Sequence, residues 1–178
     1  MIEIYDDVCS YEDNIEFYQS FIGGRFEYGE YDMPQHPPTG LISSIDQRSH
    51  IFVQLLRLFN SKSLQLDTNT KLLSVVQKSA NKILEGETKL IRPYVNLFLP
   101  NERPFFHNDG KCITCLFYFT PQYDIDEGGE TQFLVNDNIQ GILPKPSRLV
   151  IFDGTVTHRA TSFRSKPRIT AVIKFKVD

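Results

Sequence analysis

The second half of the chain, from residue 89 onward, alternates short apolar runs with turn residues, and this pattern constrains the fold more than any other feature. Short runs rich in β-branched and aromatic side chains predict strands, and the Pro, Gly, Asn and Asp residues between them predict turns. Seven or eight such strands favour an antiparallel sandwich or barrel. The runs occupy residues 90–99, 112–120, 131–135, 141–143, 148–152, 158–163 and 168–177.

The pattern of the first half of the chain indicates short strands and helices, of which the helices can be placed. Ser10 has the position of a helix N-cap before an acidic first turn, and the helix is expected to stop at Gly23-Gly24. A second helix is expected at roughly residues 43–59 and a third at roughly residues 70–84, because apolar residues recur there at helical spacing. The apolar side of the third helix is expected to consist of Leu72, Val75, Val76 and Ile83.

These elements predict a mainly β protein with N-terminal helices, in the α+β class. We expect a double-stranded β-helix, or jelly roll, with the helices packed on one sheet. Residues 1–178 are interpreted as one domain, with helical support in residues 1–88 and the β core in residues 89–178. Residues 28–40 are rich in Pro and Gly and are expected to form a loop.

Charge and hydropathy argue against some kinds of partner. The net charge of −3 and the pI near 5.8 do not favour broad contact with a nucleic-acid backbone, so no nucleic-acid partner is expected. The chain contains no apolar run of membrane-spanning length and no signal-peptide pattern, so we expect a cytoplasmic protein without a membrane partner. The sequence leaves the oligomeric state open.

The cysteines do not form a disulfide framework, because their number is odd: Cys9, Cys112 and Cys115. The spacing of Cys112 and Cys115 occurs in redox and metal-binding pairs, but these two lie in an apolar run without a second pair. A strand points residues three apart to opposite faces, so we interpret both as structural free thiols.

His107 and Asp109 form the clearest candidate for chemistry. Two positions apart on an extended segment, they project to the same side, so an imidazole nitrogen and a carboxylate oxygen can meet at one metal ion. His158 follows a predicted strand and a turn, and a folded sheet can bring it beside His107. Two histidines and one carboxylate leave three positions of an octahedron open, which suits iron(II) chemistry with oxygen.

Arg168 lies ten residues after His158, at the start of the last apolar run. A guanidinium on a barrel wall is costly unless it has a partner, and a dicarboxylic cosubstrate supplies one through a bidentate contact. Thr170 faces the same way on a strand and can add a hydroxyl hydrogen bond. We therefore place both residues in a cosubstrate site.

Together these residues resemble a known family. His107-x-Asp109, the distal His158 and Arg168 are similar to the motif of the 2-oxoglutarate/iron(II) dioxygenases, and most similar to the prolyl 4-hydroxylase-like branch. The stretch Gly128-Gly-Glu-Thr131 and residues 144–152 are similar to segments of that branch. The resemblance covers about half of the chain. Collagen-type members usually carry Lys at the place of Arg168, so collagen is not the implied substrate.

The resemblance implies a reaction and its cofactors. Such an enzyme uses iron(II), O2 and 2-oxoglutarate to hydroxylate an unactivated C–H bond, and ascorbate supports its activity. The implied substrate is a peptidyl or free prolyl residue, so the partner is a protein, a peptide or a small molecule. Tyr94 matches a tyrosine that contacts the cosubstrate in many relatives. The loop at residues 28–40 is a candidate lid.

Three alternatives stay open. A jelly-roll module can bind a metal without turnover, and an oxygenase of this kind can act on a different small metabolite. A zinc hydrolase can use the same three ligands, although Arg168 would then have no partner. Conversion of 2-oxoglutarate to succinate separates the oxygenase from the other two classes.

Overall fold

The structure is a computed structural model that describes residues 1–28, 35–64, 71–86 and 92–176. Its strands are β1 (Ile2–Tyr5), β2 (Glu27–Tyr28), β3 (Leu41–Ser44), β4 (Arg92–Phe98), β5 (Cys112–Tyr118), β6 (Thr131–Val135), β7 (Asn138–Ile142), β8 (Arg148–Asp153), β9 (His158–Ala160) and β10 (Arg168–Lys176). Its α-helices are α1 (Tyr11–Ile22), α2 (His50–Arg57) and α3 (Lys71–Leu84), and short 3-10 turns lie at Leu58–Asn60, Lys62–Leu64 and Ile125–Glu127.

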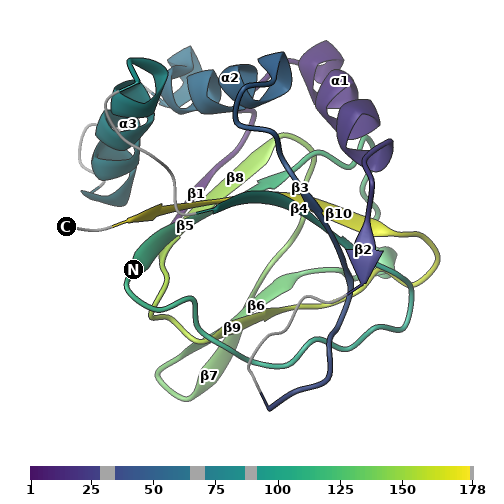
Figure 1. Cartoon of the computed structure of the whole chain (residues 1–178). Coiled ribbons are helices and arrows are strands. Elements are labelled where there is room, and N and C mark those ends of the chain that lie inside the picture. Colours follow the sequence, from purple (N-terminus) through teal and green to yellow (C-terminus); the bar gives the residue numbers. More distant parts are fainter. Residues whose placement is uncertain (29–34, 65–70, 87–91, 177–178) are drawn as a thin grey trace.

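The strands form two facing antiparallel sheets (Figure 1). The larger sheet has the order β1-β8-β5-β10-β4-β3-β2, and the smaller has the order β7-β6-β9. All three α-helices cover the outer face of the larger sheet. The predicted mainly β fold with helices packed on one sheet is confirmed, and each of the seven predicted runs overlaps one of the strands β4 to β10. The predicted run at residues 141–143 covers only the end of β7, which begins at Asn138.

The N-terminal half also supplies three short strands, whose positions were not predicted from the sequence. β1 pairs with β8, while β3 pairs with β4 and carries β2 at the edge of the sheet. The predicted start of the second helix, near Ser43, is therefore wrong. Residues 41–44 instead complete the backbone hydrogen bonds of the β4 edge. α2 begins only at His50, where the side chain of Ser49 accepts a hydrogen bond from the amide of Phe52.

The other two helices lie where they were predicted. Ser10 caps α1 by accepting a hydrogen bond from the amide of Asp13, and Gly23 ends that helix. The buried residues of α3 are Leu73, Val76 and Ala80. The predicted apolar side of α3 is wrong at Val75, which is 41% exposed, because the face that meets the sheet is centred on Val76.

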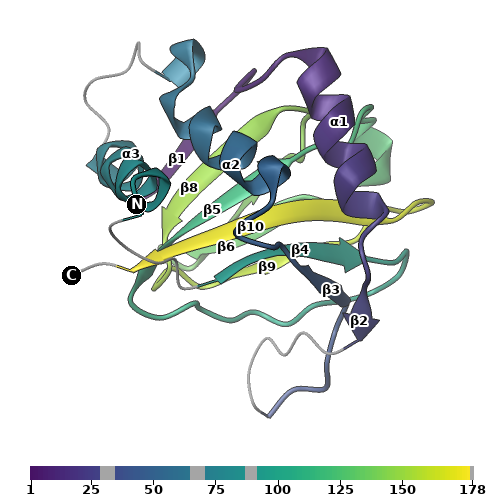
Figure 2. The ribbon, with the colours of Figure 1, turned by 45° about the horizontal axis from the view of Figure 1, so that its top comes forward.

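The helices lie over the larger sheet (Figure 2), and aromatic side chains connect the two layers. Phe17 of α1 stacks on Phe119 with ring centroids 4.6 Å apart, and Phe59 meets Phe117 of β5 edge-on at 5.3 Å. All four side chains are buried. Such pairs add to the free energy of burial and fix the position of the helices on the sheet.

β10 separates this core from a pocket between the two sheets. The helix-side core includes the alternate residues Ile169, Ala171, Ile173 and Phe175. The intervening residue Val172 belongs to the cluster between the sheets. Because side chains alternate along a strand, Arg168, Thr170 and Lys174 face the same space as Val172. One strand thus carries three polar side chains toward the inside of the fold.

Cys112 and Cys115 lie on opposite faces of β5. Cys115 belongs to the helix-side core, whereas Sγ of Cys112 lies 3.5 Å from the carbonyl oxygen of Asp109. Both are free thiols, as is Cys9.

The predicted loop at residues 28–40 is described only at its ends, because residues 29–34 lie outside the described residues. Its second end contacts the segment before the His-x-Asp pair. His36 stacks on Phe105 with ring centroids 4.1 Å apart, and the amide of Gly40 donates to Glu102 over 3.0 Å. The role of the loop as a lid stays a prediction.

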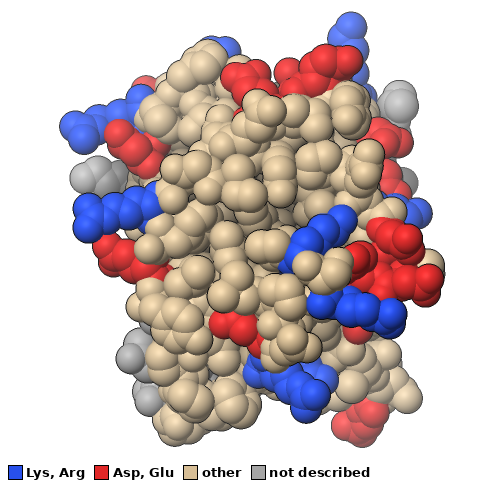
Figure 3. Space-filling view, turned by 90° about the vertical axis from the view of Figure 1, so that its right-hand side faces the viewer, with Lys and Arg blue, Asp and Glu red and all other residues tan. Residues whose placement is uncertain are grey.

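Charged side chains of both signs are mixed on the molecular face shown in Figure 3. Lys and Arg lie beside Asp and Glu along its margins, and uncharged residues fill most of its centre. Within the described ranges, none of the helices has both the length and the apolar character that crossing a bilayer requires.

Candidate metal and cosubstrate site

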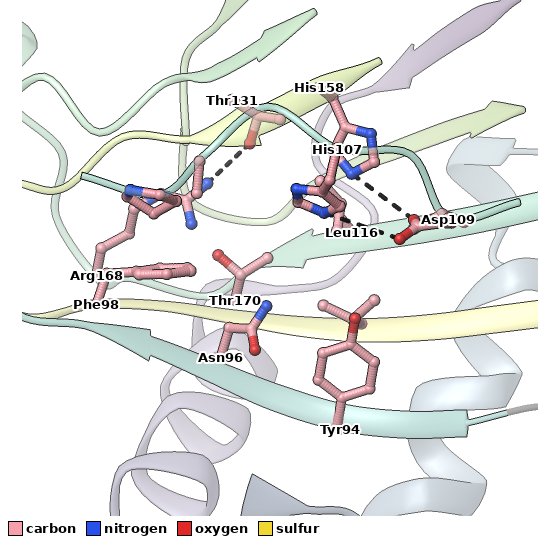
Figure 4. Close-up of a pocket in the computed structure, with 14 residues that line it drawn as sticks. Tyr94, Asn96, Phe98, His107, Asp109, Leu116, Thr131, His158, Arg168 and Thr170 are labelled. Atoms are coloured by element: carbon pink, nitrogen blue, oxygen red, sulfur yellow. Dashed lines mark hydrogen bonds and ion pairs between the residues drawn. The ribbon is translucent and has the colours of Figure 1, made fainter. Parts of the chain in front are cut away.

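A pocket lies between the two sheets and is lined by side chains from β4, β5, β9, β10 and the segment before β5 (Figure 4). It contains all six residues that the sequence analysis placed in a site: Tyr94, His107, Asp109, His158, Arg168 and Thr170. It also contains Asn96 and Thr114, which were not predicted.

His107, Asp109 and His158 converge at one end of the pocket. Nε2 of His107 lies 3.9 Å from Oδ1 of Asp109, and Nε2 of His158 lies 3.7 Å from Oδ2. One ligand atom from each residue lies within 4.8 Å of the other two. Among the described residues, this is the group of His, Cys, Asp and Glu side chains that could hold a metal ion.

Backbone contacts set the direction of both imidazoles. Nδ1 of His107 lies 3.1 Å from the carbonyl oxygen of Phe105, and Nδ1 of His158 lies 2.9 Å from that of Val156. A carbonyl oxygen only accepts hydrogen bonds, so Nδ1 of each ring carries a proton. Nε2 of each ring, on the side of Asp109, is then the atom that can bind a metal.

Burial keeps His158 neutral. It lowers the pKa of His158 to about 4, although the charge of Asp109 opposes the shift. A neutral imidazole is the form that binds a metal. Asp109 is buried too, which raises its pKa, but the charge of Lys174 and hydrogen bonds from Lys174 and Thr114 leave that pKa below the ordinary value. The site therefore offers two imidazole nitrogens and one carboxylate.

Two polar side chains hold the Asp109 carboxylate. Nζ of Lys174 lies 2.7 Å from Oδ1, and the hydroxyl of Thr114 donates to Oδ2 over 2.6 Å. The amide of Asp109 donates to the carbonyl oxygen of Gly154 over 2.7 Å. Neither Lys174 nor Thr114 was predicted from the sequence to contact the site, although both are polar residues inside predicted apolar strands. The geometry and protonation of the three predicted ligands fit a divalent metal such as iron(II).

Arg168 occupies the opposite end of the pocket and is only 2% exposed. Its Nε donates to the carbonyl oxygen of Gly129 over 2.7 Å, and one terminal nitrogen donates to the hydroxyl of Thr131 over 2.8 Å. No Asp or Glu among the described residues forms an ion pair with it. Burial lowers the pKa of Arg168, but an arginine stays charged in a protein. Glu130 acts on this charge only from beyond ion-pair distance, so the guanidinium makes no direct contact with a carboxylate of the described residues.

The Gly128-Gly129 pair has a structural role in this network. Gly129 has φ +78°, and a Cβ there would lie 2.3 Å from ring atoms of Phe163. Only glycine combines that backbone angle with such close packing. The turn directs the carbonyl of Gly129 to Arg168 and starts β6 at Thr131.

Two further polar atoms between Arg168 and the triad lack partners. Oγ1 of Thr170 and Oδ1 of Asn96 are buried without a hydrogen bond in the described structure. The two residues are register partners on β10 and β4. Tyr94, two residues before Asn96, is 4% exposed and points into the pocket beside them (Figure 4). Unpaired polar groups at one end and metal-binding groups at the other fit a ligand that carries an anionic group and a chelating group.

No protein-family model and no curated protein matches the chain by sequence. Solved structures match its fold. A prolyl 4-hydroxylase from Pseudomonas putida superposes with a TM-score of 0.65 at 14% identity, over 99% of this chain and 93% of that one. A prolyl hydroxylase from Trichoplax adhaerens, solved with a peptide fragment of hypoxia inducible factor, gives 0.60 at 14% identity over 98% and 83%.

A third match, HygX from Streptomyces hygroscopicus, was solved with nickel and 2-oxoglutarate bound. Its TM-score is 0.62 at 10% identity, over 97% of this chain and 81% of that one. Identities this low show the fold and leave substrates open. The chain has the double-stranded β-helix fold of the 2-oxoglutarate/iron(II) oxygenases, with a His-x-Asp…His triad in its pocket.

Proposed function

We propose that the protein is an iron(II)- and 2-oxoglutarate-dependent dioxygenase that hydroxylates an unactivated C–H bond. His107, Asp109 and His158 hold the iron, and Arg168 binds the far carboxylate of 2-oxoglutarate. One observation carries the proposal: the buried Arg168 forms no ion pair with a carboxylate of the described residues, and it shares a pocket with the triad. A dicarboxylate such as 2-oxoglutarate would supply a carboxylate to Arg168 and a chelating group to the metal.

The residues of the chain bind and orient the reactants. Arg168 offers an edge of its guanidinium to a carboxylate, which gives charge-assisted hydrogen bonds. Thr170 donates its unpaired hydroxyl, and Tyr94 contacts the cosubstrate from β4. When bound, iron(II) and 2-oxoglutarate supply the oxidising chemistry, in which O2 is consumed and 2-oxoglutarate leaves as succinate and carbon dioxide. The apolar side chains of Phe98, Leu116 and Val172 line the same pocket and exclude water from it.

The proposed substrate is a prolyl residue, either free or in a peptide. Two of the matched structures are prolyl hydroxylases, and one of them holds a peptide. The partner is accordingly a protein, a peptide or a small molecule, ascorbate supports activity, and the enzyme works in the cytoplasm. HygX has the same fold, so an oxygenase acting on another small metabolite is the alternative.

Turnover of the cosubstrate tests the proposal. Purified protein is incubated with iron(II), ascorbate, O2 and 2-oxoglutarate, and succinate is measured with and without a panel of prolyl peptides and free proline. We expect succinate from the wild type and none from the Asp109→Ala variant. A protein that binds metal but forms no succinate is a binding module, and a hydrolase shows no dependence on 2-oxoglutarate.

The substrate needs its own readout. Each panel member is analysed by mass spectrometry for the gain of one oxygen atom. A prolyl peptide or proline that gains oxygen supports the prolyl assignment. Gain of oxygen on another metabolite, with none on any prolyl compound, would overturn the prolyl assignment and leave the dioxygenase in place.

A further inference from the structure

The geometry points to Lys174 as a positioning residue that holds Asp109 in the metal-free pocket and lowers the affinity of the pocket for a divalent metal. This role rests on the proposed function, because it concerns the proposed iron ligand Asp109. Nζ of Lys174 lies 2.7 Å from Oδ1 of that carboxylate.

The sheet builds this contact from two strands. Lys174 of β10 lies directly opposite Thr114 of β5 in the register of the larger sheet. Both side chains reach Asp109, one at each carboxylate oxygen. Because neighbouring strands in register hold both donors, the carboxylate is fixed from two sides before any metal arrives. Its direction toward His107 and His158 follows from those two bonds.

The charge of Lys174 compensates a buried carboxylate. The side chain of Asp109 is only 5% exposed and that of Lys174 is 16% exposed. A carboxylate buried to this degree is costly without a partner of opposite charge. The Nε2 atoms of His107 and His158 lie 3.9 Å and 3.7 Å from its oxygens, whereas Nζ of Lys174 lies within hydrogen-bond distance of Oδ1. Lys174 is therefore the cation that stabilises Asp109 in the metal-free protein.

The same charge opposes the metal. A divalent ion held by His107, Asp109 and His158 shares one carboxylate with the ammonium of Lys174. Like charges that share a partly buried carboxylate repel each other more strongly than they do in water. Binding of the metal must also compete with the ion pair that Lys174 already forms with Asp109. Removal of the ammonium should therefore strengthen metal binding, even though it weakens the metal-free fold.

Arg168, at the other end of β10, differs from Lys174 in its partners. Both side chains lie on the same face of β10, but Arg168 donates its hydrogen bonds to neutral groups, a carbonyl oxygen and a hydroxyl group. Lys174 already has its anion. β10 thus carries two cations with different partners: Arg168 for the proposed cosubstrate, and Lys174 for the proposed metal ligand Asp109.

Variants at Lys174 test this role without any measurement of activity. Lys174→Met keeps most of the length of the side chain and removes the charge. Lys174→Arg keeps the charge. Lys176→Met makes the same apolar change two residues along β10 at an exposed position and is the matched control. Calorimetric titration of each metal-free protein with cobalt(II), in the absence of 2-oxoglutarate, gives the affinity, and thermal unfolding gives the stability.

We expect Lys174→Met to bind cobalt(II) at least about tenfold more tightly than the wild type, a gain of about 1.4 kcal/mol. Its metal-free form should unfold at a lower temperature. Lys174→Arg and Lys176→Met should bind within about threefold of the wild type, the scatter expected of neutral changes. If Lys174→Met does not fold, Lys174→Gln carries the same prediction, because it also removes the charge.

Equal or weaker binding by the uncharged variants would overturn the role, since a purely structural residue lowers affinity when it is removed. Two other outcomes separate this role from the proposed function. If only the uncharged variants bind cobalt(II), Lys174 does oppose the metal but the wild type is not an iron enzyme. If no variant binds and the wild type does not either, both the role and the metal site are wrong.

Discussion

The main chains of His107 and His158 are joined by two hydrogen bonds, of 3.0 Å from the amide of His107 and 2.8 Å from the amide of His158. This isolated bridge fastens the segment before β5 to the start of β9. The ring centroids of the two imidazoles lie 4.5 Å apart as a result. Residues far apart in the chain thus present two nitrogens to one carboxylate.

Loss of one of the three proposed metal ligands should strongly reduce the affinity for a divalent metal. Asp109→Ala is expected to weaken binding of cobalt(II) or iron(II) by at least about a hundredfold. Loss of a residue that only hydrogen-bonds to a metal ligand already weakens metal binding by about 10- to 100-fold, and loss of the ligand itself should cost more. The calorimetric titration is done under anaerobic conditions for iron(II). His50→Ala, at the start of α2, is the control and should bind like the wild type. Wild-type affinity in a His107→Ala, Asp109→Ala double variant would place the metal elsewhere.

The metal-free protein should lose stability on acidification through His158. The pKa of His158 is about 4 in the folded protein and 6.5 in the unfolded chain. Between these values the unfolded chain binds a proton that the folded one does not, so the free energy of unfolding rises with pH. The loss on going from pH 6.5 to pH 4 is at most about 3 kcal/mol.

Urea unfolding at several pH values measures this dependence. A His158→Gln variant has no such proton to bind, so its stability should change less with pH in the same window. His50→Gln should keep the wild-type dependence. A His158→Gln curve that runs parallel to the wild-type curve would contradict the assignment of this proton to His158.

Gly129 offers a test of the Arg168 network. Gly129→Ala places a Cβ 2.3 Å from Phe163 at φ +78°, whereas Gly86→Ala has φ +79° with no atom within 4 Å. The control isolates the backbone strain, which costs about 1 kcal/mol or somewhat more. Gly129→Ala should lose at least about 2 kcal/mol more than the control in urea unfolding, because the ring must also move. An equal decrease in the free energy of unfolding in the two variants would show that the contact with Phe163 does not contribute to the cost.

The cysteines should all titrate as free thiols. Cys112 and Cys115 point to opposite faces of β5, so a bond between them requires the strand to be rebuilt. A thiol reagent applied to denatured protein, purified without reductant, should count three thiols. A count of one, with mass spectrometry linking Cys112 to Cys115, would contradict the strand.

Periodicity and spacing predicted much of this molecule. The strands β4 to β10 were predictable because their apolar runs are separated by strong turn residues. The positions of His107, Asp109 and Arg168 on extended segments followed from the same alternation. The position of β3 was not predictable, because the predicted second helix, at roughly residues 43–59, begins inside it, and only pairing with the edge of β4 makes residues 41–44 a strand.

Lys174 shows what the sequence could not provide. A lysine near the end of a strand is usually exposed, and the pairing of Lys174 with Asp109 depends on β10 lying beside β5. That neighbourhood is a property of the topology. Thr114 and Asn96 were more predictable than Lys174, because each is a polar residue inside an otherwise apolar strand.

Arg168 connects the fold to the proposed chemistry. Arg168→Ala removes the guanidinium that faces the unpaired groups of Thr170 and Asn96, while the metal ligands stay in place. Affinity for 2-oxoglutarate should fall by about a hundredfold, since two charge-assisted hydrogen bonds are worth about 3 kcal/mol. Arg168→Lys should lose less, because it keeps the charge without the two-pronged contact. Arg159→Ala, a half-buried arginine outside the pocket, is the control.

The most direct measurement is the rate of succinate formation against 2-oxoglutarate concentration for the wild type, Arg168→Ala, Arg168→Lys and Arg159→Ala at fixed iron(II). We predict iron-dependent conversion of 2-oxoglutarate to succinate by the wild type and by Arg159→Ala. We also predict a KM raised about a hundredfold in Arg168→Ala and less in Arg168→Lys, with unchanged metal affinity throughout. An unchanged KM in Arg168→Ala, or no succinate from the wild type with any substrate, would contradict the proposed function.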